Sequence, residues 1–232
     1  MTHETYRATM GFATVTIAPP TTRRVTVDAK AWDERYAAHD LVWSAEPNRF
    51  VAEIIGPLTP GHAVDLAAGE GRNAIWMVEQ GWVVTASDFS PVAVERMRSL
   101  AADRLGDDLS RLTAVVADAT QSAPGGPAAY DLALLCYLQL PADEWRQALR
   151  SAVESVRPGG HVVVIGHAGR NLAEGWGGPS ERTVLYDPEE VLDRAEGLPV
   201  TALQSGIRQR PVPTDDGERV ALDTVVVLRR EG

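Results

Sequence analysis

The sequence predicts an α/β fold: a doubly wound, seven-stranded and mostly parallel sheet with a C-terminal antiparallel hairpin. Beyond Gly61, short apolar segments rich in β-branched residues alternate with segments of helical period. Strands and helices in regular alternation form a parallel sheet that is covered by helices on both faces. Near the C-terminus two β-like segments follow one another without a helix, and Asp215-Asp216-Gly217 between them is typical of a hairpin turn. The hairpin therefore adds an antiparallel strand to a sheet that is otherwise parallel.

The N-terminal part differs from the rest in composition and pattern. Residues 1–28 contain Pro19-Pro20, many threonines and no helical period. We interpret them as an N-terminal extension, either a loose segment or the product of a start codon placed too early. After it the pattern becomes helical, and a second helix begins near Pro47 and ends at the prolines that follow. Residues 29–232 are thus predicted to form one domain, with residues 29–60 as a helical cap at its start.

The elements of the sheet follow in order along the chain. Ser90 and Pro91 mark the start of one helix, as N-cap and first helical residue, and Asp187 and Pro188 mark the start of another. Pro158-Gly159-Gly160 is predicted to end a helix before the next strand. The predicted strands are residues 62–66, 82–86, 112–116, 130–136, 161–165, 200–210 and 219–229, and the predicted helices are residues 72–80, 91–102, 142–156 and 187–195.

Length and composition limit the classes of function. A chain of 232 residues with 44% hydrophobic and 23% charged residues is long enough for one α/β domain with a full core. Its net charge of −10 repels phosphate backbones, which argues against nucleic acid as the main partner. Cys136 is the single cysteine, so no disulfide forms within the chain, which fits a reducing cytoplasm. No apolar run approaches the roughly 20 residues that cross a bilayer, and no secretory signal is visible. We expect a cytoplasmic protein with a small-molecule substrate and no membrane partner, whose oligomeric state the sequence leaves open.

A glycine-rich loop lies between the first predicted strand and the first helix of the sheet. Gly69 and Gly71 in this loop allow the backbone to turn tightly and to approach a ligand closely. The helix that follows offers free N–H groups at its start. On its own the loop also fits a dinucleotide fingerprint, Gly69-x-Gly71-x-x-Ala74.

Acidic residues at the ends of successive strands narrow the choice of ligand. Asp88 ends the second strand, where a carboxylate accepts both hydroxyls of a ribose. Asp118 ends the third strand, where an acid accepts a hydrogen bond from an adenine amino group. Asp65 directly precedes the loop and can face an ammonium, which S-adenosylmethionine (SAM) has and NAD lacks. Each of them alone could be an ordinary loop residue or helix cap, but three at one edge of the sheet favour a SAM site.

Together these residues resemble the motifs of class I SAM-dependent methyltransferases. The matching segments are Asp65-x-Ala67-x-Gly69-x-Gly71 for motif I, Asp88 for the ribose-binding acid, Asp118 for the adenine-side acid, Tyr130-Asp131-Leu132-Ala133-Leu134 for the fourth motif and Arg157-Pro158-Gly159-Gly160 for the turn before the fifth strand. The resemblance covers about residues 29–230. It implies a Rossmann-like methyltransferase fold, SAM as the cofactor and transfer of its methyl group to a small-molecule acceptor.

The resemblance also assigns a cofactor site. Its residues are Asp65, Ala67, Gly69, Gly71, Asn73, Asp88, Phe89, Asp118, Ala119, Cys136 and, from the cap, Trp43. Ala67 stands where motif I has its first glycine, and its methyl group is expected to narrow the loop slightly while remaining compatible with a negative φ.

A narrower resemblance concerns the cap and the loop. Trp32-Asp33-Glu34-Arg35-Tyr36, Trp43 and Pro47, together with the glycine loop, are similar to the tellurite-resistance and thiopurine methyltransferase group and to many bacterial small-molecule methyltransferases. That group implies a small, soft or polarizable nucleophile. Its tellurite-type members use a histidine–arginine pair in the terminal hairpin, and the absence of a histidine from this hairpin argues against tellurite.

Two residues are candidates for the chemistry. Methyl transfer from a sulfonium is an in-line displacement, so much of the catalysis comes from holding the nucleophile and the methyl group in line. A general base is needed only if the nucleophile arrives protonated. His167, after the fifth strand, is the candidate base, and Tyr137, after the fourth strand, is the candidate to orient the substrate. A solvated histidine and a packing tyrosine are the alternatives, and no metal is expected.

The acceptor pocket is predicted from Trp176, Arg208 and Arg210. Trp176 lies among glycines in residues 166–182, which form either a mobile cover over the site or a surface loop. Arg208 and Arg210 lie in the first strand of the hairpin, where they either bind an anionic substrate or are simply solvated.

The sequence disfavours two of three alternative functions. An NAD-dependent oxidoreductase is disfavoured because Lys30, the only lysine, belongs to no Tyr-x-x-x-Lys pair. A nucleic-acid methyltransferase is disfavoured because Cys136-Tyr137-Leu138-Gln139 stands where base-amino methylases carry Asn/Asp-Pro-Pro-aromatic. No residue excludes a non-catalytic SAM-binding module, and the acceptor atom is not defined by the sequence.

Overall fold

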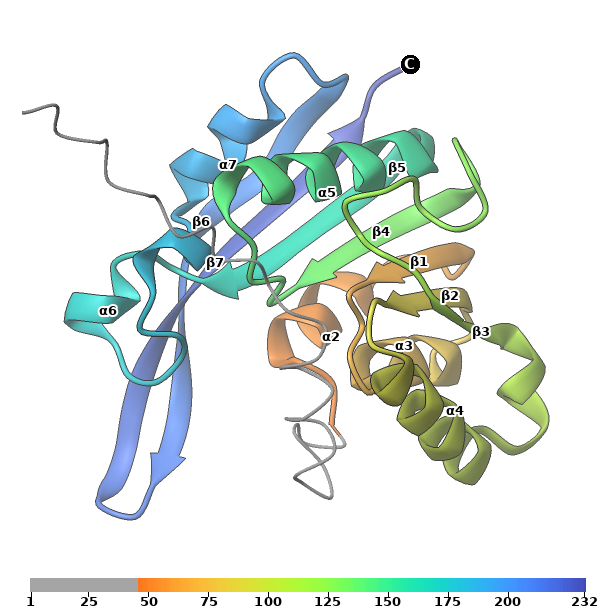
Figure 1. The fold of residues 1–232 in the computed structure, drawn as a ribbon, viewed down its shortest axis with the longest axis horizontal. Helices are drawn as coiled ribbons and strands as arrows, with labels where there is room; N and C mark the ends of the chain where they lie inside the picture. The colour runs from red at the N-terminus through yellow and green to blue at the C-terminus, as the bar shows by residue number, and fades with distance from the viewer. Residues whose placement is uncertain (1–45) are drawn as a thin grey trace, which may run out of the picture.

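A computed structural model describes residues 46–232, so the predicted extension at residues 1–28, its boundary and the first cap helix lie outside the described residues. Within residues 46–232 one sheet of seven strands has the order β3-β2-β1-β4-β5-β7-β6 (Figure 1). The first five strands pair in parallel, and β7 is antiparallel to both β5 and β6. The predicted fold class is therefore confirmed, including the antiparallel hairpin at its end.

The observed elements follow the predicted ones closely. The strands are β1 (His62–Leu66), β2 (Val83–Asp88), β3 (Leu112–Val116), β4 (Tyr130–Cys136), β5 (Val156–His167), β6 (Val200–Thr214) and β7 (Gly217–Arg230). The helices are α2 (Arg49–Ile55), α3 (Arg72–Glu79), α4 (Pro91–Leu105), α5 (Ala142–Ser155), α6 (Asn171–Glu174) and α7 (Pro188–Ala195), and residues 106–111 and 182–184 form short 3-10 helices. Ser90 caps α4 through its side chain, and Asp187 forms a capping box with Glu190 at the start of α7, as expected from the sequence.

The alternation of side chains along the strands builds two cores, one on each face of the sheet. On one face Leu66 of β1 and Leu135 of β4 pack with Trp145 of α5 and with residues of α7. On the other face Leu134 of β4 packs with Phe50 of α2, and α3 and α4 cover the same side. Figure 1 shows α5 and α7 on one side of the sheet and α2, α3 and α4 on the other. Both faces are covered, as parallel sheets require.

One predicted turn belongs to a strand instead. Residues 158–160 were expected to separate a helix from the next strand, but β5 begins at Val156, directly after α5. The pairing of β4 with β5 shifts register between Tyr130 and Leu132, which absorbs the extra residues. A Cβ on Gly160 would lie 2.6 Å from the carbonyl oxygen of Asp131, so this glycine allows the close approach of the two strands.

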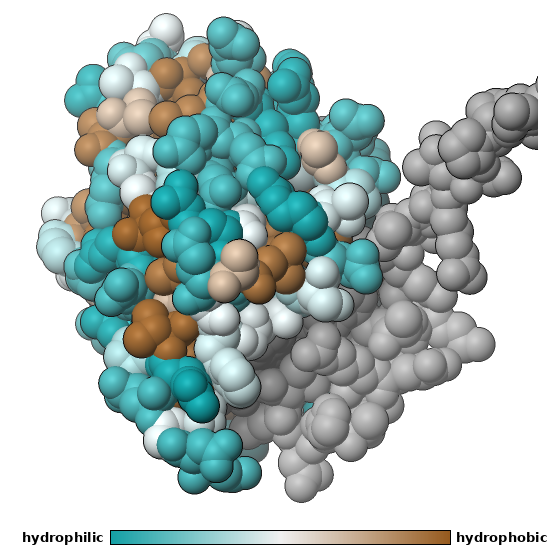
Figure 2. Space-filling model, turned by 90° about the vertical axis from the view of Figure 1, so that its left-hand side faces the viewer, coloured by the Kyte–Doolittle hydropathy of each residue, from teal (hydrophilic) through white to brown (hydrophobic). Residues whose placement is uncertain are grey.

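The hairpin extends beyond the rest of the sheet. β6 and β7 pair along their whole length, from Val200 and Arg230 to Thr214 and Gly217, whereas β5 pairs only with residues 223–229 of β7. The far end of the hairpin therefore projects past the sheet beside α6 (Figure 1). The face seen in Figure 2 is mostly hydrophilic, with apolar residues in small separate groups. Within residues 46–232 no helix combines the length and apolar character needed to span a membrane.

Candidate active site

The first cavity lies where the strand order reverses, between β1 and β4. The loops after β1, β2 and β4 meet there, at the carboxyl edge of the sheet, which is where ligands bind in such folds. They enclose a cavity of about 280 Å³. Nine residues of the predicted cofactor site line it, namely Asp65, Ala67, Gly69, Asn73, Asp88, Phe89, Asp118, Ala119 and Cys136. Gly71 is absent from this lining, and Trp43 lies outside the described residues.

The glycine loop is held in a left-handed backbone conformation at three positions. Ala67 has φ 59°, Gly69 φ 58° and Gly71 φ 83°. The expectation of a negative φ at Ala67 was therefore wrong. A left-handed alanine costs about 1–2 kcal/mol, and the hydrogen bond from the Ala68 N–H to the Ser87 carbonyl oxygen, 2.8 Å, holds the loop in place against the end of β2. Gly71 allows the loop to pack closely against α4, because a Cβ there would lie 2.3 Å from Cγ of Met97.

Asp88 fixes the loop to the end of β2. Its Oδ2 accepts a hydrogen bond from the Gly69 N–H at 2.9 Å, and its Oδ1 accepts one from the Ser90 N–H at 3.0 Å. The side chain is almost fully buried and lines the cavity. The carboxylate is thus held in one orientation by the backbone on both sides.

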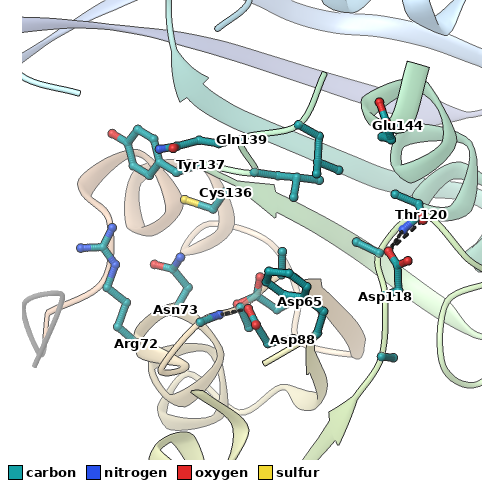
Figure 3. A pocket seen from close by; sticks show the side chains of 18 of the residues that line it. Asp65, Arg72, Asn73, Asp88, Asp118, Thr120, Cys136, Tyr137, Gln139 and Glu144 are labelled. Carbon is teal, nitrogen blue, oxygen red and sulfur yellow. Dashed lines mark hydrogen bonds between the residues drawn. The ribbon is translucent and has the colours of Figure 1, made fainter. Parts of the chain in front are cut away.

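The charged side chains that line the first cavity are mostly acidic. Asp65 and Asp88 lie side by side at its base, and Asp118 lies on the side near Thr120 and Glu144 (Figure 3). Asp118 is exposed, and its Oδ1 accepts hydrogen bonds from the N–H and the hydroxyl of Thr120, both at 2.8 Å. Among the described lining residues, the four carboxylates face a single arginine, Arg72. This end of the molecule is therefore suited to a ligand with positive charge.

A second cavity of about 620 Å³ adjoins the first. It lies between the start of α2, the end of β5, the glycine-rich segment after α6 and the hairpin. Arg72, Tyr137 and Gln139 line both cavities, so the two spaces meet at these residues. In Figure 3 the three side chains lie at the end of the first cavity that is away from Asp118. His167, Trp176 and Arg210 also line the second cavity.

His167 is backed by a buried carboxylate that the sequence did not reveal. The pairing of β5 with β7 places His167 directly opposite Asp223, whose side chain is fully buried. His167 Nδ1 lies 3.3 Å from Asp223 Oδ1, in a close polar contact without the angle of a well-formed hydrogen bond. Neither atom has another hydrogen-bond partner among residues 46–232, so each is the natural partner of the other. With Nδ1 turned to the carboxylate, Nε2 is the nitrogen left for a ligand.

Tyr137 and Arg210 complete a network around Asp223. The Tyr137 hydroxyl donates to Asp223 Oδ2 at 2.8 Å, and Arg210 Nε donates to the same oxygen at 2.6 Å. Asn48 Nδ2 donates to the Tyr137 hydroxyl at 3.3 Å. Burial alone would raise the pKa of Asp223, but the close donors His167 and Arg210 outweigh burial and hold the pKa below its usual value. Asp223 is thus a charged carboxylate in the interior, with Tyr137 and Arg210 donating to Oδ2 and His167 facing Oδ1.

Tyr137 is held as a proton donor rather than a base. Its backbone has φ 57°, an uncommon conformation for a tyrosine, which turns the side chain from the end of β4 toward the hairpin. Burial, followed by the negative charge of Asp223, raises the pKa of its hydroxyl above the ordinary value. Its ring centroid lies 4.6 Å from that of His167. Tyr137 therefore positions its neighbours while keeping its proton.

Comparison with known proteins decides the family of the central segment. Residues 63–160, which contain the glycine loop and the acids that line the first cavity, match the family model described as a methyltransferase domain. This segment is a methyltransferase domain. The domain transfers a methyl group from SAM, its cofactor, and no finding supports the oxidoreductase or the non-catalytic module. Among curated protein sequences none matches the methyltransferase.

Several solved structures share the fold of the methyltransferase. One, from work on the conversion of a disulfide bond into a thioacetal group during echinomycin biosynthesis, is 19% identical with a TM-score of 0.70, over 88% of this chain and 91% of that one. The 1,6-didemethyltoxoflavin-N1-methyltransferase of Burkholderia thailandensis is 20% identical with a TM-score of 0.54, over 87% and 79%. TehB from Haemophilus influenzae is 13% identical with a TM-score of 0.62, over 86% and 67%. At these identities the likeness establishes the fold alone.

The first cavity of the methyltransferase fits SAM. Both carboxylate oxygens of Asp65 are buried without a hydrogen-bond partner among residues 46–232. Burial, and then the negative charge of Asp88, raises the pKa of Asp65 to about 8, with Arg72 acting in the opposite direction. A buried acid without a partner is costly unless a ligand supplies one. The ammonium group of SAM would be such a partner, and the assignment of Asp88 to the ribose and of Asp118 to the adenine stays a prediction.

The remaining predicted residues fall in different places. Cys136 lines the first cavity, and burial raises the pKa of its thiol to about 12, so it is a neutral wall residue. Trp176 lines the second cavity with 48% of its surface exposed, and Arg219 lies 5.2 Å above its ring. Arg208 lines neither cavity and pairs with Glu53 of α2 at 2.7 Å. Its proposed role in substrate binding stays a prediction.

The glycine-rich segment at residues 166–182 is more ordered than a free cover. It contains α6, and the buried Asn171 donates to the Gly177 carbonyl oxygen and accepts a hydrogen bond from the Leu222 N–H. A Cβ on Gly178 would lie 3.0 Å from the ring of His167, so the segment packs directly against the candidate base.

Proposed function

We propose that the methyltransferase methylates a small molecule bound in the second cavity, and that His167 accepts the proton of the nucleophile. The observation that carries the proposal is the position of the His167–Asp223 pair in a cavity that meets the SAM cavity at Tyr137, Gln139 and Arg72. When bound, SAM supplies an activated methyl group on a sulfonium. The residues of the chain hold the acceptor beside it and remove its proton.

The division of labour follows from the contacts of each residue. Asp223 is a positioning residue, because its contact with Nδ1 fixes the ring of His167 and favours the tautomer with Nε2 unprotonated. Tyr137 and Arg210 hold Asp223 and line the cavity that would receive the acceptor. A base of this kind contributes roughly 10²–10⁴ to the rate when the nucleophile arrives protonated.

The acceptor class and the compartment belong to the same proposal. The B. thailandensis neighbour is an N1-methyltransferase with a small molecule bound, which supports a small-molecule acceptor for this chain. Cys136 is a free cysteine, which supports action in the reducing cytoplasm. The acidic charge of the chain supports a partner other than nucleic acid.

The test begins with transfer of labelled methyl groups from SAM to a panel of small phenols, thiols, amines and chalcogen oxyanions. With the best acceptor, His167→Gln is expected to lower kcat by about 10²-fold or more while affinity for S-adenosylhomocysteine stays unchanged. His62→Gln is the control, because His62 is exposed at the opposite end of β1. Wild-type turnover by His167→Gln would refute the role of His167.

A further inference from the structure

Three side chains stand where the two cavities meet, namely Arg72, Tyr137 and Gln139. An acceptor that reacts with the methyl group of SAM has to reach this junction from the second cavity. Arg72 serves the first cavity, because its positive charge opposes the rise in the pKa of Asp65. A polar contact with the acceptor at the junction therefore falls to Tyr137 or Gln139.

The Tyr137 hydroxyl has no capacity left for an acceptor molecule. It donates its one proton to Asp223 Oδ2. Its oxygen accepts from Asn48 Nδ2 at 3.3 Å and, in a bond shared with Asp223, from Arg210 Nε at 3.1 Å. One donated and two accepted hydrogen bonds are the full capacity of a hydroxyl group. Tyr137 thus contributes a fixed ring to the junction but no free polar atom.

Gln139 keeps both of its polar atoms available within residues 46–232. Its amide forms no hydrogen bond with any described residue, and the side chain is half-buried. Figure 3 shows the amide directed to the same end of the first cavity as Tyr137. An amide presents one acceptor oxygen and one donor nitrogen. Gln139 is therefore the polar side chain at the junction that remains for the acceptor molecule.

The number of protons on the nucleophile distinguishes oxygen and sulfur from nitrogen. A hydroxyl or thiol carries one proton, which passes to His167, and a hydrogen bond donated by Gln139 to the attacking atom would only withdraw its lone pair. A primary amine carries two protons, so one passes to His167 and the other needs an acceptor. Gln139 Oε1 can accept it and leaves the nitrogen lone pair free for the methyl group. The amide at the junction thus favours an N–H nucleophile.

The lining of the second cavity favours an aromatic amine over an alkyl amine. Its described residues include no carboxylate, so an alkylammonium ion finds no counter-charge there, and it has no lone pair for the attack. An aromatic amine is neutral at physiological pH and keeps its lone pair. Tyr137 and Trp176 line this cavity with rings against which a planar body can pack.

We propose that the acceptor is a planar primary aromatic amine and that Gln139 selects it by accepting a hydrogen bond from its N–H. This inference rests on the proposed function and names the substrate class of the same site. In the transfer, the nitrogen lone pair forms the bond to the methyl carbon, and the carbon–sulfur bond breaks with its electrons going to sulfur. One proton of the nitrogen passes to Nε2 of His167, and the other stays on nitrogen in the hydrogen bond to Gln139. The products are the N-methylamine, S-adenosylhomocysteine and a protonated histidine that returns its proton to solvent.

Matched acceptors test the choice of nucleophile. The probes are 4-aminobenzamide and 6-aminoquinoline, each compared with its hydroxy and mercapto analogues, and 4-(aminomethyl)benzamide as the alkylammonium. Binding to the enzyme saturated with S-adenosylhomocysteine is measured by calorimetry, and methyl transfer from labelled SAM is measured separately. At least one aromatic amine is expected to bind about fivefold or more tightly than its hydroxy analogue. Equal affinity within both sets, tighter binding of the alkylammonium, or no binding of either aromatic amine at millimolar concentration overturns the inference.

A variant of Gln139 locates the selection. Gln139→Met has a side chain of similar length without the amide. It is expected to weaken binding of the preferred amine about fivefold and to leave binding of the hydroxy analogue and of S-adenosylhomocysteine within about twofold. Gln147→Met is the control, because Gln147 is exposed on α5 and lies outside both cavity linings. Equal weakening of amine and hydroxy analogue, weakening of neither, or a loss confined to S-adenosylhomocysteine also overturns the inference.

The two readouts separate this inference from the proposed function. Selective binding of aromatic amines that is lost in Gln139→Met, without methyl transfer to any probe, would refute the proposed function and leave the selectivity of Gln139 standing. Transfer to the hydroxy analogues as fast as to the amines, with loss of both in His167→Gln, would refute the amine class and leave the proposed function standing.

Discussion

Binding of SAM is expected to release a proton from Asp65. The pKa of Asp65 is raised to about 8 by burial and by Asp88, so at pH 6.5 roughly 97% of the free enzyme carries this proton. An ammonium group beside the carboxyl favours its ionised form, and the proton then leaves. The amine of SAM, with an ordinary pKa of about 7.7–8.0, takes up only about 0.05 proton at pH 6.5. The net release at pH 6.5 is therefore about 0.9 proton per site.

The same arithmetic predicts how the release changes with pH. At pH 8 Asp65 releases about 0.5 proton, and the amine of SAM takes up about as much, so the net exchange falls to roughly zero. The folding stability of the enzyme without SAM also depends on the ionisation of Asp65. Because the folded pKa lies above the unfolded value, ionising Asp65 costs folding free energy as pH rises from about 4 to 8. Because binding of SAM releases a proton, SAM is expected to bind more tightly and to stabilise the enzyme more strongly near pH 8 than at pH 6.5.

Calorimetry in two buffers measures the proton number directly. Titrations of SAM at pH 6.5 in phosphate and in an amine buffer differ in heat by the proton number times the difference in buffer ionisation enthalpy. Asp65→Asn has nearly the same shape and cannot ionise, so it is expected to bind SAM without the release. Release of the same 0.9 proton by Asp65→Asn, or none by the wild type, would show that Asp65 does not meet the ammonium.

Three further predictions concern the two cavities. Asp88→Ala removes the acceptor of the Gly69 N–H together with charge-assisted hydrogen bonds worth about 1.5–3 kcal/mol. Calorimetry is expected to show SAM affinity falling at least about tenfold. An unchanged affinity would place the ribose elsewhere. Trp176→Ala is expected to slow methyl transfer while SAM affinity stays within about twofold of wild type, because Trp176 lines only the second cavity. Turnover at the wild-type rate would show that Trp176 is only a surface residue. Asp223→Asn and Arg210→Met are expected to destabilise the protein non-additively in urea, with a coupling of about 1–3 kcal/mol at pH 7. The depressed pKa of Asp223 means that its share of this stability is present above about pH 4 and is lost as pH falls further; additive costs at pH 7 would contradict the pairing.

The cofactor side of the site could be predicted because its signals are local in sequence. Asp65, Asp88 and Asp118 lie at or just beyond the carboxyl ends of β1, β2 and β3, and parallel strands bring these ends to one edge of the sheet. Glycine spacing then marked the loop between them. No knowledge of strand order was needed, since any doubly wound order leaves these ends together. For this reason nine of the predicted cofactor residues line one cavity.

The acceptor side depends on pairing between distant strands, which the sequence does not display. Asp223 meets His167 only because β7 inserts between β5 and β6 and pairs with β5 in that register. A shift by one residue would turn the carboxylate to the opposite face. The only local signal was a single acid within the apolar run of β7, where a buried charge requires a partner.

Two arginines on one strand illustrate the same limit. Arg208 and Arg210 lie two residues apart on β6 and so point to the same face. The register places Arg208 opposite Asp223, yet Arg210 makes the ion pair, and Glu53 of α2 binds Arg208 instead. The difference arises from the position of α2 against the hairpin, which no sequence pattern in β6 indicates.

Asn48, the N-cap of α2, connects residues that line the two cavities, and α2 therefore belongs to the site. Its Oδ1 caps α2 by accepting hydrogen bonds from the N–H groups of Phe50 and Val51. Its own N–H donates to Asn73 Oδ1 in α3 at 2.9 Å, and its Nδ2 donates to the Tyr137 hydroxyl. One buried side chain thus ties the start of α2 to the helix behind the SAM loop and to the network that holds Asp223. Because Asp223 in turn contacts His167, displacement of α2 would disturb both cavities together, and with them the proposed base.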